Sequence, residues 1–185
     1  MRPDGRNMQP AENQPYLVGL HLAGRRVLVA GGGPVAERRL PALLAAGADV
    51  EVVSPRLTPQ LHGRHQCGEI TWQARDFRAA DLDGAWYALA LTDSAAVNAD
   101  VVSEARRRRI FCVRGDDAAQ GDASTPATAR HDVLQVGVLG GGDPRRAASL
   151  RDEVLEALQE GTFDVRRRRT AEPGGEGSDQ AQPDR

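Results

Sequence analysis

The chain has 185 residues, 40% of them hydrophobic, and a formal net charge of −2 at pH 7. This length allows one ordinary domain with a small appendage, and the charge excludes bulk attraction to nucleic acid or to an anionic membrane. All 24 basic residues are arginines, so reactions that need a lysine side chain are excluded. The two cysteines make no disulfide framework, and no apolar run approaches the length of a membrane span. We therefore expect a cytoplasmic protein with no membrane or nucleic-acid partner.

The chain begins with a polar segment. Residues 1–15 are rich in Pro, Asn, Gln and Arg and show no periodicity, so we expect a disordered leader. Residues 16–22 are mostly apolar and are either a short strand or a packing arm.

The next segment has the pattern strand, turn, helix, strand. Residues 25–30 form an apolar run of strand length that stops at three glycines. A helical pattern follows over 34–46 and ends at Gly47, a favourable capping residue, with Pro41 expected to kink the helix or loosen one turn. Residues 50–53 are the next predicted strand, and this order is typical of a βαβ unit.

Further elements extend the same pattern. Residues 56–68 are a loop, or a short helix followed by a loop, and a helix is expected over 95–108, capped by Asp93 or Ser94. Strands joined by crossovers imply a parallel sheet with helices on both faces, so we predict an α/β fold with a Rossmann-type doubly wound parallel sheet over 16–114. Its remaining strands are expected over 70–73, 86–91 and 110–113.

After residue 114 a small α+β extension is predicted over 115–163. It consists of a polar loop, two strands, a turn and a helix, over 115–122, 125–129, 133–139, 140–144 and 147–159. The unit is too small to bury a core alone, so we expect it to pack on the first domain or on a second chain. Residues 164–185 are expected to be a disordered tail, in which Arg166–Arg169 is either a nucleic-acid contact or, as we favour, a solvated segment.

The glycines carry the strongest motif. Gly31, Gly33 and Ala36 match G-x-G-x-x-A between a strand and a helix. In such a turn the first glycine permits the sharp bend, the second lets the backbone approach a pyrophosphate, and the small third residue allows close packing, while the helix N-terminus attracts phosphates. We therefore predict a dinucleotide-binding site; the alternative is a structural glycine turn that binds nothing.

The second strand lacks the acidic residue that binds the ribose of NAD in many such domains. Val53 is followed by Ser54, Pro55 and Arg56. Ser54 is a candidate for binding ribose, and Arg56 either accepts the 2′-phosphate of NADP or is a solvated loop residue. The residues alone leave the choice between NAD and NADP open.

Polar residues also follow the later strands, at the edge where parallel sheets bind ligands. Thr92 and Asp93 are either cleft residues or part of a helix cap. Asp116 and Asp117 follow the next strand, and a carboxylate there is either solvated or placed to assist proton removal near the nicotinamide. His62, His65 and Cys67 are three possible metal ligands in one short segment, but no fourth ligand lies nearby, so we predict no metal site there.

Taken together, residues 16 to about 161 resemble the precorrin-2 dehydrogenase/sirohydrochlorin ferrochelatase domain of siroheme synthases. The resemblance covers most of the chain, and its combination of motifs is more specific than the glycine turn alone. The matching segments are 27–38 (VLVAGGGPVAER), 43–48 (LLAAGA), 90–98 (ALTDSAAVN), 108–112 (RRIFC), Asp116, Pro126 and 141–144 (GGDP).

This resemblance implies NAD-dependent oxidation of precorrin-2 to sirohydrochlorin, with insertion of ferrous iron as a second activity. It implies a homodimer in which the region after the nucleotide domain is exchanged between subunits, so that residues 115–163 would be a dimerisation and substrate extension. It assigns catalysis to Asp116 and NAD contacts to Pro34, Val35, Pro55 and Arg56. The predicted site is thus Asp116 for catalysis and, for NAD, Gly31, Gly33, Pro34, Val35, Ser54, Pro55, Arg56, Thr92 and Asp93.

The chain departs from the family pattern in several places. Residues 113–115 (Val-Arg-Gly) stand where the family often has Asn, Asp143 replaces a hydroxyl residue, and the helical region after about residue 157 is short. These departures bear on tetrapyrrole contacts and on the chelatase activity. Two further hypotheses are a chelatase alone and a non-enzymatic NAD(H)-binding dimer, either a redox sensor or a partner subunit of a methyltransferase; a sensor would need a DNA-reading element, which the sequence does not show.

Overall fold

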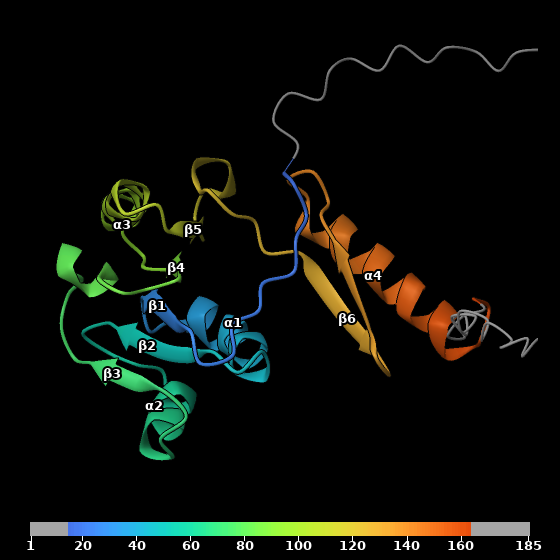
Figure 1. Cartoon of the computed structure of the whole chain (residues 1–185), viewed down its shortest axis with the longest axis horizontal. Coiled ribbons are helices and arrows are strands. Elements are labelled where there is room, and N and C mark those ends of the chain that lie inside the picture. Colours follow the sequence, from blue (N-terminus) through green and yellow to red (C-terminus); the bar gives the residue numbers. More distant parts are fainter. Residues whose placement is uncertain (1–14, 164–185) are drawn as a thin grey trace, which may run out of the picture.

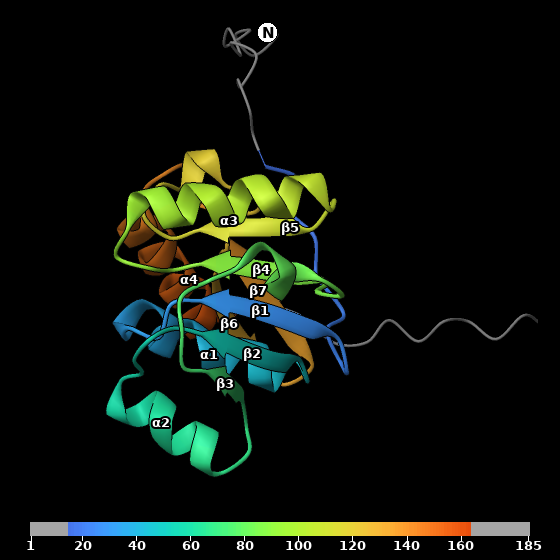
Figure 2. The ribbon, with the colours of Figure 1, turned by 90° about the vertical axis from the view of Figure 1, so that its left-hand side faces the viewer.

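The computed structural model describes residues 15–163, and most of these belong to a domain built on a five-stranded parallel sheet (Figure 1). The strand order is β3-β2-β1-β4-β5, and Figure 2 shows the strands side by side in this order. Every neighbouring pair is parallel. The strands are β1 (Arg26–Ala30), β2 (Asp49–Val53), β3 (Thr71–Gln73), β4 (Tyr87–Ala90) and β5 (Phe111–Arg114).

Helices cover both faces of this sheet. Val29 of β1 packs in one apolar cluster with residues of the first two helices, whereas its neighbour Leu28 packs in a second cluster with residues of the third. Successive side chains of a strand point to opposite faces, so a strand covered on both sides is apolar throughout. The doubly wound α/β fold predicted from the sequence is confirmed. The helices are α1 (Pro34–Ala45), α2 (Pro59–Gln66), α3 (Ala95–Arg107) and the short 3-10 helix η1 (Ala79–Leu82).

Some boundaries differ from the expected ones. Residues 16–22 form no strand, and Leu22 is their one buried side chain. α1 continues without interruption through Pro41. The last strand of the sheet begins and ends one residue later than predicted, so Arg114 belongs to it and its side chain is buried. This shift places a charged group at the carboxyl end of β5.

After β5 and the short 3-10 helix η2 (Ala118–Gln120), the chain forms the expected α+β unit. β6 (Ala127–His131) and β7 (Leu134–Val138) make an antiparallel hairpin, and α4 (Pro144–Gln159) packs against both strands. α4 begins three residues earlier than predicted because the carboxylate of Asp143 caps it by accepting hydrogen bonds from the first backbone N–H groups.

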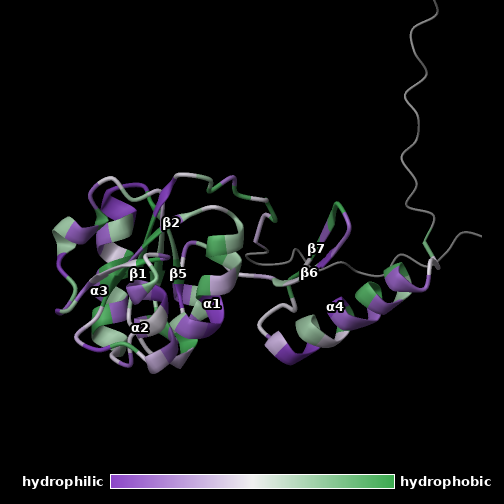
Figure 3. Cartoon of the chain, turned by 90° about the horizontal axis from the view of Figure 1, so that it is seen from below, coloured by the Kyte–Doolittle hydropathy of each residue, from purple (hydrophilic) through white to green (hydrophobic). Residues whose placement is uncertain are grey.

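This unit buries little of its own surface. Figures 1 and 3 show the hairpin and α4 standing apart from the five-stranded sheet. Within α4 only Ala147 and Leu158 are buried, whereas Leu150 is 49% exposed and Val133 of the hairpin turn is 68% exposed. A unit with so small a core gains stability from a further apolar surface.

The predicted tail (164–185, with Arg166–Arg169) and all but the last residue of the predicted leader (1–15) lie outside the described residues. Among residues 15–163, no helix is both long enough and apolar enough to cross a membrane.

Candidate functional site

The glycine turn joins β1 to α1, and its packing requires glycine at two positions. Gly31 has a φ of +114°, and a Cβ atom there would lie 2.5 Å from the carbonyl oxygen of Leu91. A Cβ atom on Gly32 would lie 2.3 Å from the carbonyl oxygen of Arg56. Gly33 differs, because its φ is −89° and an added Cβ would meet no atom within 4 Å. The first two glycines thus allow loops to pack closely, and the third leaves open space beside the turn.

That open space is part of a cavity of about 690 Å³, a volume typical of small-molecule sites. Its walls come from the loops that follow β1, β2, β3 and β4, which is the edge where such sheets bind ligands. Most of the predicted cofactor residues line it: Gly31, Gly33, Ser54, Pro55, Arg56, Thr92 and Asp93. The other two, Pro34 and Val35, lie at the start of α1 and are not part of the lining.

The N-terminus of α1 faces this cavity through its capping residue, Gly33. No side chain caps the helix, and its first hydrogen bond is the one that the backbone N–H of Glu37 donates to the carbonyl oxygen of Gly33. Pro34 has no N–H group to leave unsatisfied, while the N–H groups of Val35 and Ala36 precede the first helical hydrogen bond. Together with the helix dipole, these groups suit an anionic ligand such as a pyrophosphate.

The loop after β2 is held by its own hydrogen bonds. The Ser54 hydroxyl donates to the carbonyl oxygen of Arg56 over 2.8 Å, and the indole N–H of Trp72 donates to the Ser54 carbonyl oxygen over 2.9 Å. Ser54 therefore shapes the loop with its one hydroxyl proton and keeps lone pairs that can accept a hydrogen bond. The Arg56 side chain is exposed at the rim.

Sequence reasoning missed several residues of the lining. Asp76 and Phe77 come from the loop after β3, and the rule that ligands bind at the carboxyl ends of strands could have identified them. Gly32 was not singled out because it lies between the two motif positions. The remaining missed residues are Val53, Leu57, Thr58, Ser94 and Val97.

In the loop after β4, helix capping and lining of the cavity, the two roles expected from the sequence, belong to different residues. Ser94 caps α3, since its hydroxyl oxygen accepts a hydrogen bond from the backbone N–H of Val97. Asp93 is exposed and lines the cavity. Thr92 lines the cavity as well, and its hydroxyl donates over 2.8 Å to the side-chain oxygen of Asn98.

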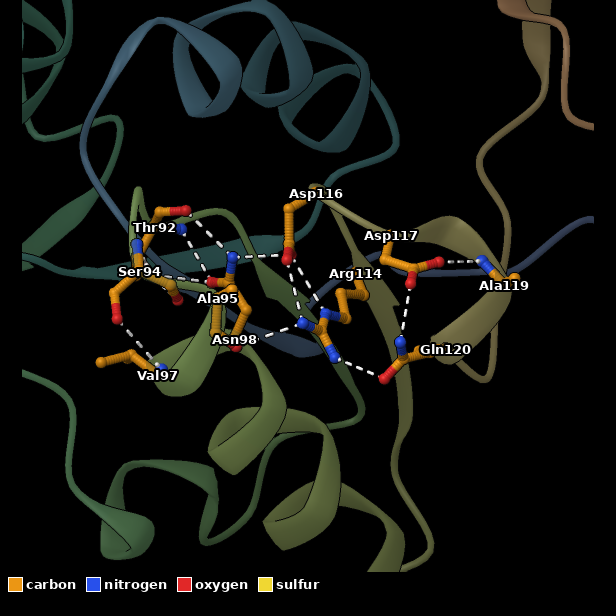
Figure 4. Close-up of polar contacts among 10 residues, drawn as sticks. All are labelled: Thr92, Ser94, Ala95, Val97, Asn98, Arg114, Asp116, Asp117, Ala119 and Gln120. Carbon is orange, nitrogen blue, oxygen red and sulfur yellow. Dashed lines mark hydrogen bonds and ion pairs between the residues drawn. The ribbon is translucent and has the colours of Figure 1, made fainter.

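Asp116 lies beyond the cavity lining but is connected to it (Figure 4). Its Oδ1 accepts a hydrogen bond of 2.7 Å from the Asn98 amide and one of 3.1 Å from Nε of Arg114, and its Oδ2 accepts one of 2.9 Å from Nη2 of Arg114. Asn98 is fully buried on α3 and also bonds to Thr92. A chain of hydrogen bonds thus runs from Asp116 to the cavity wall.

The charge state of Asp116 follows from these contacts. The hydrogen bonds from the Arg114 guanidinium, supported by that from Asn98, lower the pKa of the Asp116 carboxyl to about 2 although partial burial opposes the change. In return, the carboxylate raises the pKa of Arg114. With 32% of its side chain exposed, Asp116 is a solvent-accessible carboxylate that stays ionised near neutral pH.

The other polar residues considered in the sequence have structural contacts. Asp117 caps η2 and accepts hydrogen bonds from the backbone N–H of Ala119 and the amide of Gln120, so it turns away from Asp116 (Figure 4). His62 and His65 both pack edge-on against Trp72. Within residues 15–163 no group of three or more His, Cys, Asp or Glu residues is arranged to hold a metal ion.

The fold and the cavity define a Rossmann-type dinucleotide-binding domain. The model of a family described as NAD(P)-binding matches residues 18–127, more than half of the chain. The chain belongs to this family, which forms the N-terminal domain of siroheme synthases. The resemblance inferred from the sequence is thus confirmed, as is the prediction of a nicotinamide dinucleotide cofactor.

The similar proteins include several siroheme synthases. The chain is 40% identical over 137 residues to siroheme synthase 1 of Aeromonas salmonicida and 39% identical over 137 residues to that of Serratia proteamaculans. Each match covers 74% of this chain and 29% of the relative, so the chain spans less than a third of these proteins. A solved structure of SirC, a precorrin-2 dehydrogenase, has a TM-score of 0.64 and 26% identity, over 81% of this chain and 72% of that one.

Proposed function

We propose that this protein oxidises precorrin-2 to sirohydrochlorin with NAD as the electron acceptor. The observation that carries the proposal is the cavity at the carboxyl edge of the sheet, joined by hydrogen bonds to the ionised Asp116. It is supported by the likeness to a solved precorrin-2 dehydrogenase and by the identity with siroheme synthases. The proposal places this chain in siroheme biosynthesis.

The residues around the cavity fit a dinucleotide. The open space at Gly33 and the free N–H groups of Val35 and Ala36, which follow Pro34 at the start of α1, suit the pyrophosphate. When bound, NAD supplies an acceptor for a hydride. We assign the rest of its binding to residues of the lining, with Gly31 shaping the turn and Ser54, Pro55, Arg56, Thr92 and Asp93 forming the walls.

Asp116 is the proposed catalytic residue. Removal of a hydride leaves positive charge on the substrate and a proton to be lost, and a fixed carboxylate beside the reacting carbon stabilises the first and assists the second. Its side chain is accessible to a ligand and already ionised. The carboxylate needs no prior deprotonation to act at neutral pH.

The α+β unit is the proposed dimerisation and substrate extension. We take residues 16–114 as the NAD-binding domain and 115–163 as this extension, with a second copy of the chain covering the apolar side chains that α4 and the hairpin leave exposed. Ferrous iron is included as a second substrate on the family resemblance alone. Sedimentation of the purified chain tests the dimer, and iron insertion into sirohydrochlorin without NAD tests the chelatase.

The decisive experiment is anaerobic turnover of precorrin-2 with NAD or NADP, followed by the absorbance of the reduced nicotinamide. We expect turnover with NAD and a large loss in Asp116→Ala. Asp117→Ala is the matched control, because it removes the neighbouring carboxylate, whose contacts are to η2. Full activity of Asp116→Ala would remove Asp116 from the mechanism.

The same experiment tests the competing hypothesis of a dimer that binds NAD(H) without chemistry. That hypothesis predicts NADH binding, measured by nicotinamide fluorescence, with no turnover of precorrin-2 or sirohydrochlorin. Preference for NADP over NAD would instead assign Arg56 to the 2′-phosphate, and Arg56→Ala would then reduce that preference.

A further inference from the structure

Both oxygens of Asp116 are occupied by donors that come from two different elements. Arg114, the last residue of β5, approaches with two nitrogens, and Asn98 approaches from α3. A bidentate guanidinium contact fixes the plane of a carboxylate, and the third donor fixes its position. The Asp116 side chain is therefore held in one orientation rather than free in a loop.

The Arg114 side chain makes all of its hydrogen bonds within the protein. It is buried, with 8% of the side chain exposed, although it carries a charge. Besides its two bonds to Asp116, it donates to the Gln120 side chain over 2.9 Å and to the Ala95 carbonyl oxygen over 3.1 Å. Four of its five N–H groups are thus used inside the protein, so Arg114 is not arranged to bind a substrate carboxylate.

The Asn98 side chain is likewise fully hydrogen-bonded within the protein. Its side-chain oxygen accepts from the backbone N–H and the hydroxyl of Thr92, over 3.0 and 2.8 Å, and its amide donates to the Thr92 carbonyl oxygen over 2.9 Å and to Asp116 over 2.7 Å. These bonds satisfy every donor and acceptor of a fully buried amide. Thr92 is part of the cavity wall, so Asn98 joins that wall to Asp116.

We propose that Arg114 and Asn98 are positioning residues that hold Asp116 as a fixed carboxylate at the end of the cofactor cavity. This inference rests on the proposed function. Arg114 provides the compensating charge and orientation, and Asn98 sets the position relative to Thr92. Asp117 is a further charged group that contributes to the field at Arg114, and it is itself bonded to η2. Asp116 then acts through its permanent charge on the substrate.

The first test needs no substrate. The carboxyl group of Asp116 is followed by ¹³C NMR in the full chain, in the parent, Arg114→Met and Arg26→Met. Arg26 is the matched control because it also contacts a carboxylate, Glu51, with two nitrogens, although both reach one oxygen, and it lies at the amino end of β1, away from Asp116. At pH 4 we expect Asp116 to be about 99% ionised in the parent and in Arg26→Met, and about half ionised in Arg114→Met, as its pKa returns towards about 3.9. An unchanged ionisation in Arg114→Met would overturn the proposal.

The second test separates positioning from general damage. We expect Arg114→Met to lower kcat for precorrin-2 by about 10- to 100-fold while KM for NAD changes less than about threefold. In the Asp116→Ala background, Arg114→Met should cause no further loss, because it acts through Asp116. Equal losses in the two backgrounds would refute this role. If Arg114→Met does not fold, Arg114→Lys keeps the charge with a single contact, and we expect an intermediate ionisation of Asp116.

Asn98 is tested in the same way. Asn98→Asp keeps the shape but replaces the donor to Asp116 by an oxygen, so we expect a loss of kcat and weaker NADH binding through Thr92. NADH binding equal to that of the parent would refute the link to the cavity wall. Absence of turnover in the parent would refute the proposed reaction, and with it the catalytic part of this inference, while the ionisation of Asp116 would still show whether Arg114 holds it.

Discussion

The glycine turn allows one prediction to be worked out in detail, because its glycines have opposite surroundings. At Gly33 the backbone suits any residue and an added Cβ points into free space. Gly33→Ala should therefore fold normally with its stability changed by less than about 1 kcal/mol, because a less flexible unfolded chain offsets the poorer capping of α1 by alanine. The same Cβ enters the space assigned to the pyrophosphate, so we expect NADH binding to weaken at least about tenfold, or about 1.4 kcal/mol.

Gly31→Ala should instead destabilise the fold. A φ of +114° is strained for alanine, and the added Cβ would lie 2.5 Å from the carbonyl oxygen of Leu91, the residue that follows β4. Backbone strain of about 1–3 kcal/mol and a steric clash of similar size give a loss of about 2–6 kcal/mol. That is a large part of the stability of an ordinary domain.

Urea unfolding measures the free energy of unfolding of both variants, and the quenching or enhancement of NADH fluorescence measures binding. Gly33→Ala that is stable and binds NADH as tightly as the parent would refute the placement of the pyrophosphate at this turn. Gly31→Ala that is as stable as the parent would refute the packing argument itself.

Three further predictions concern other parts of the chain. The pKa of the Asp116 carboxyl is about 2 in the folded chain, which is below its value in the unfolded chain. The ionised carboxylate therefore stabilises the fold by about 1 kcal/mol after solvent screening, and this contribution is present above about pH 4 and is lost as the pH falls towards 2. The difference in unfolding free energy between the parent and Asp116→Asn should shrink over that range. Burial raises the pKa of the Cys112 thiol to about 12, so iodoacetamide at pH 8 should label Cys67 and spare Cys112 until urea unfolds the chain, as mass spectrometry would show. Asp143→Ala removes the cap of α4 and should cost about 1 kcal/mol, seen as faster hydrogen exchange in the first turn of α4, whereas unchanged exchange would contradict the capping role.

Much of the fold follows from local patterns in the chain. The apolar runs of β1, β2, β4 and β5 and the helical periodicity between them predicted a doubly wound sheet, because strands buried on both faces and amphipathic helices each leave a distinct pattern. The boundaries were less accurate where capping decided them. Pro144 seemed to belong to a turn, but it begins α4 because Asp143 accepts the first free N–H groups.

The sequence by itself also predicted a phosphate-binding turn, since Gly31 and Gly33 stand between a strand and a helix, where the first permits the sharp bend and the second leaves room for a pyrophosphate. Its place after a strand made Asp116 a candidate, and the family resemblance then assigned catalysis to it. Only the tertiary structure decided what surrounds that carboxylate. Arg114 and Asn98 lie on different elements, 16 positions apart, and meet Asp116 because β5 and α3 pack together. Because β5 extends to Arg114, the guanidinium group of that residue is buried. A buried charge is costly without an opposite charge beside it, and Asp116 is that partner.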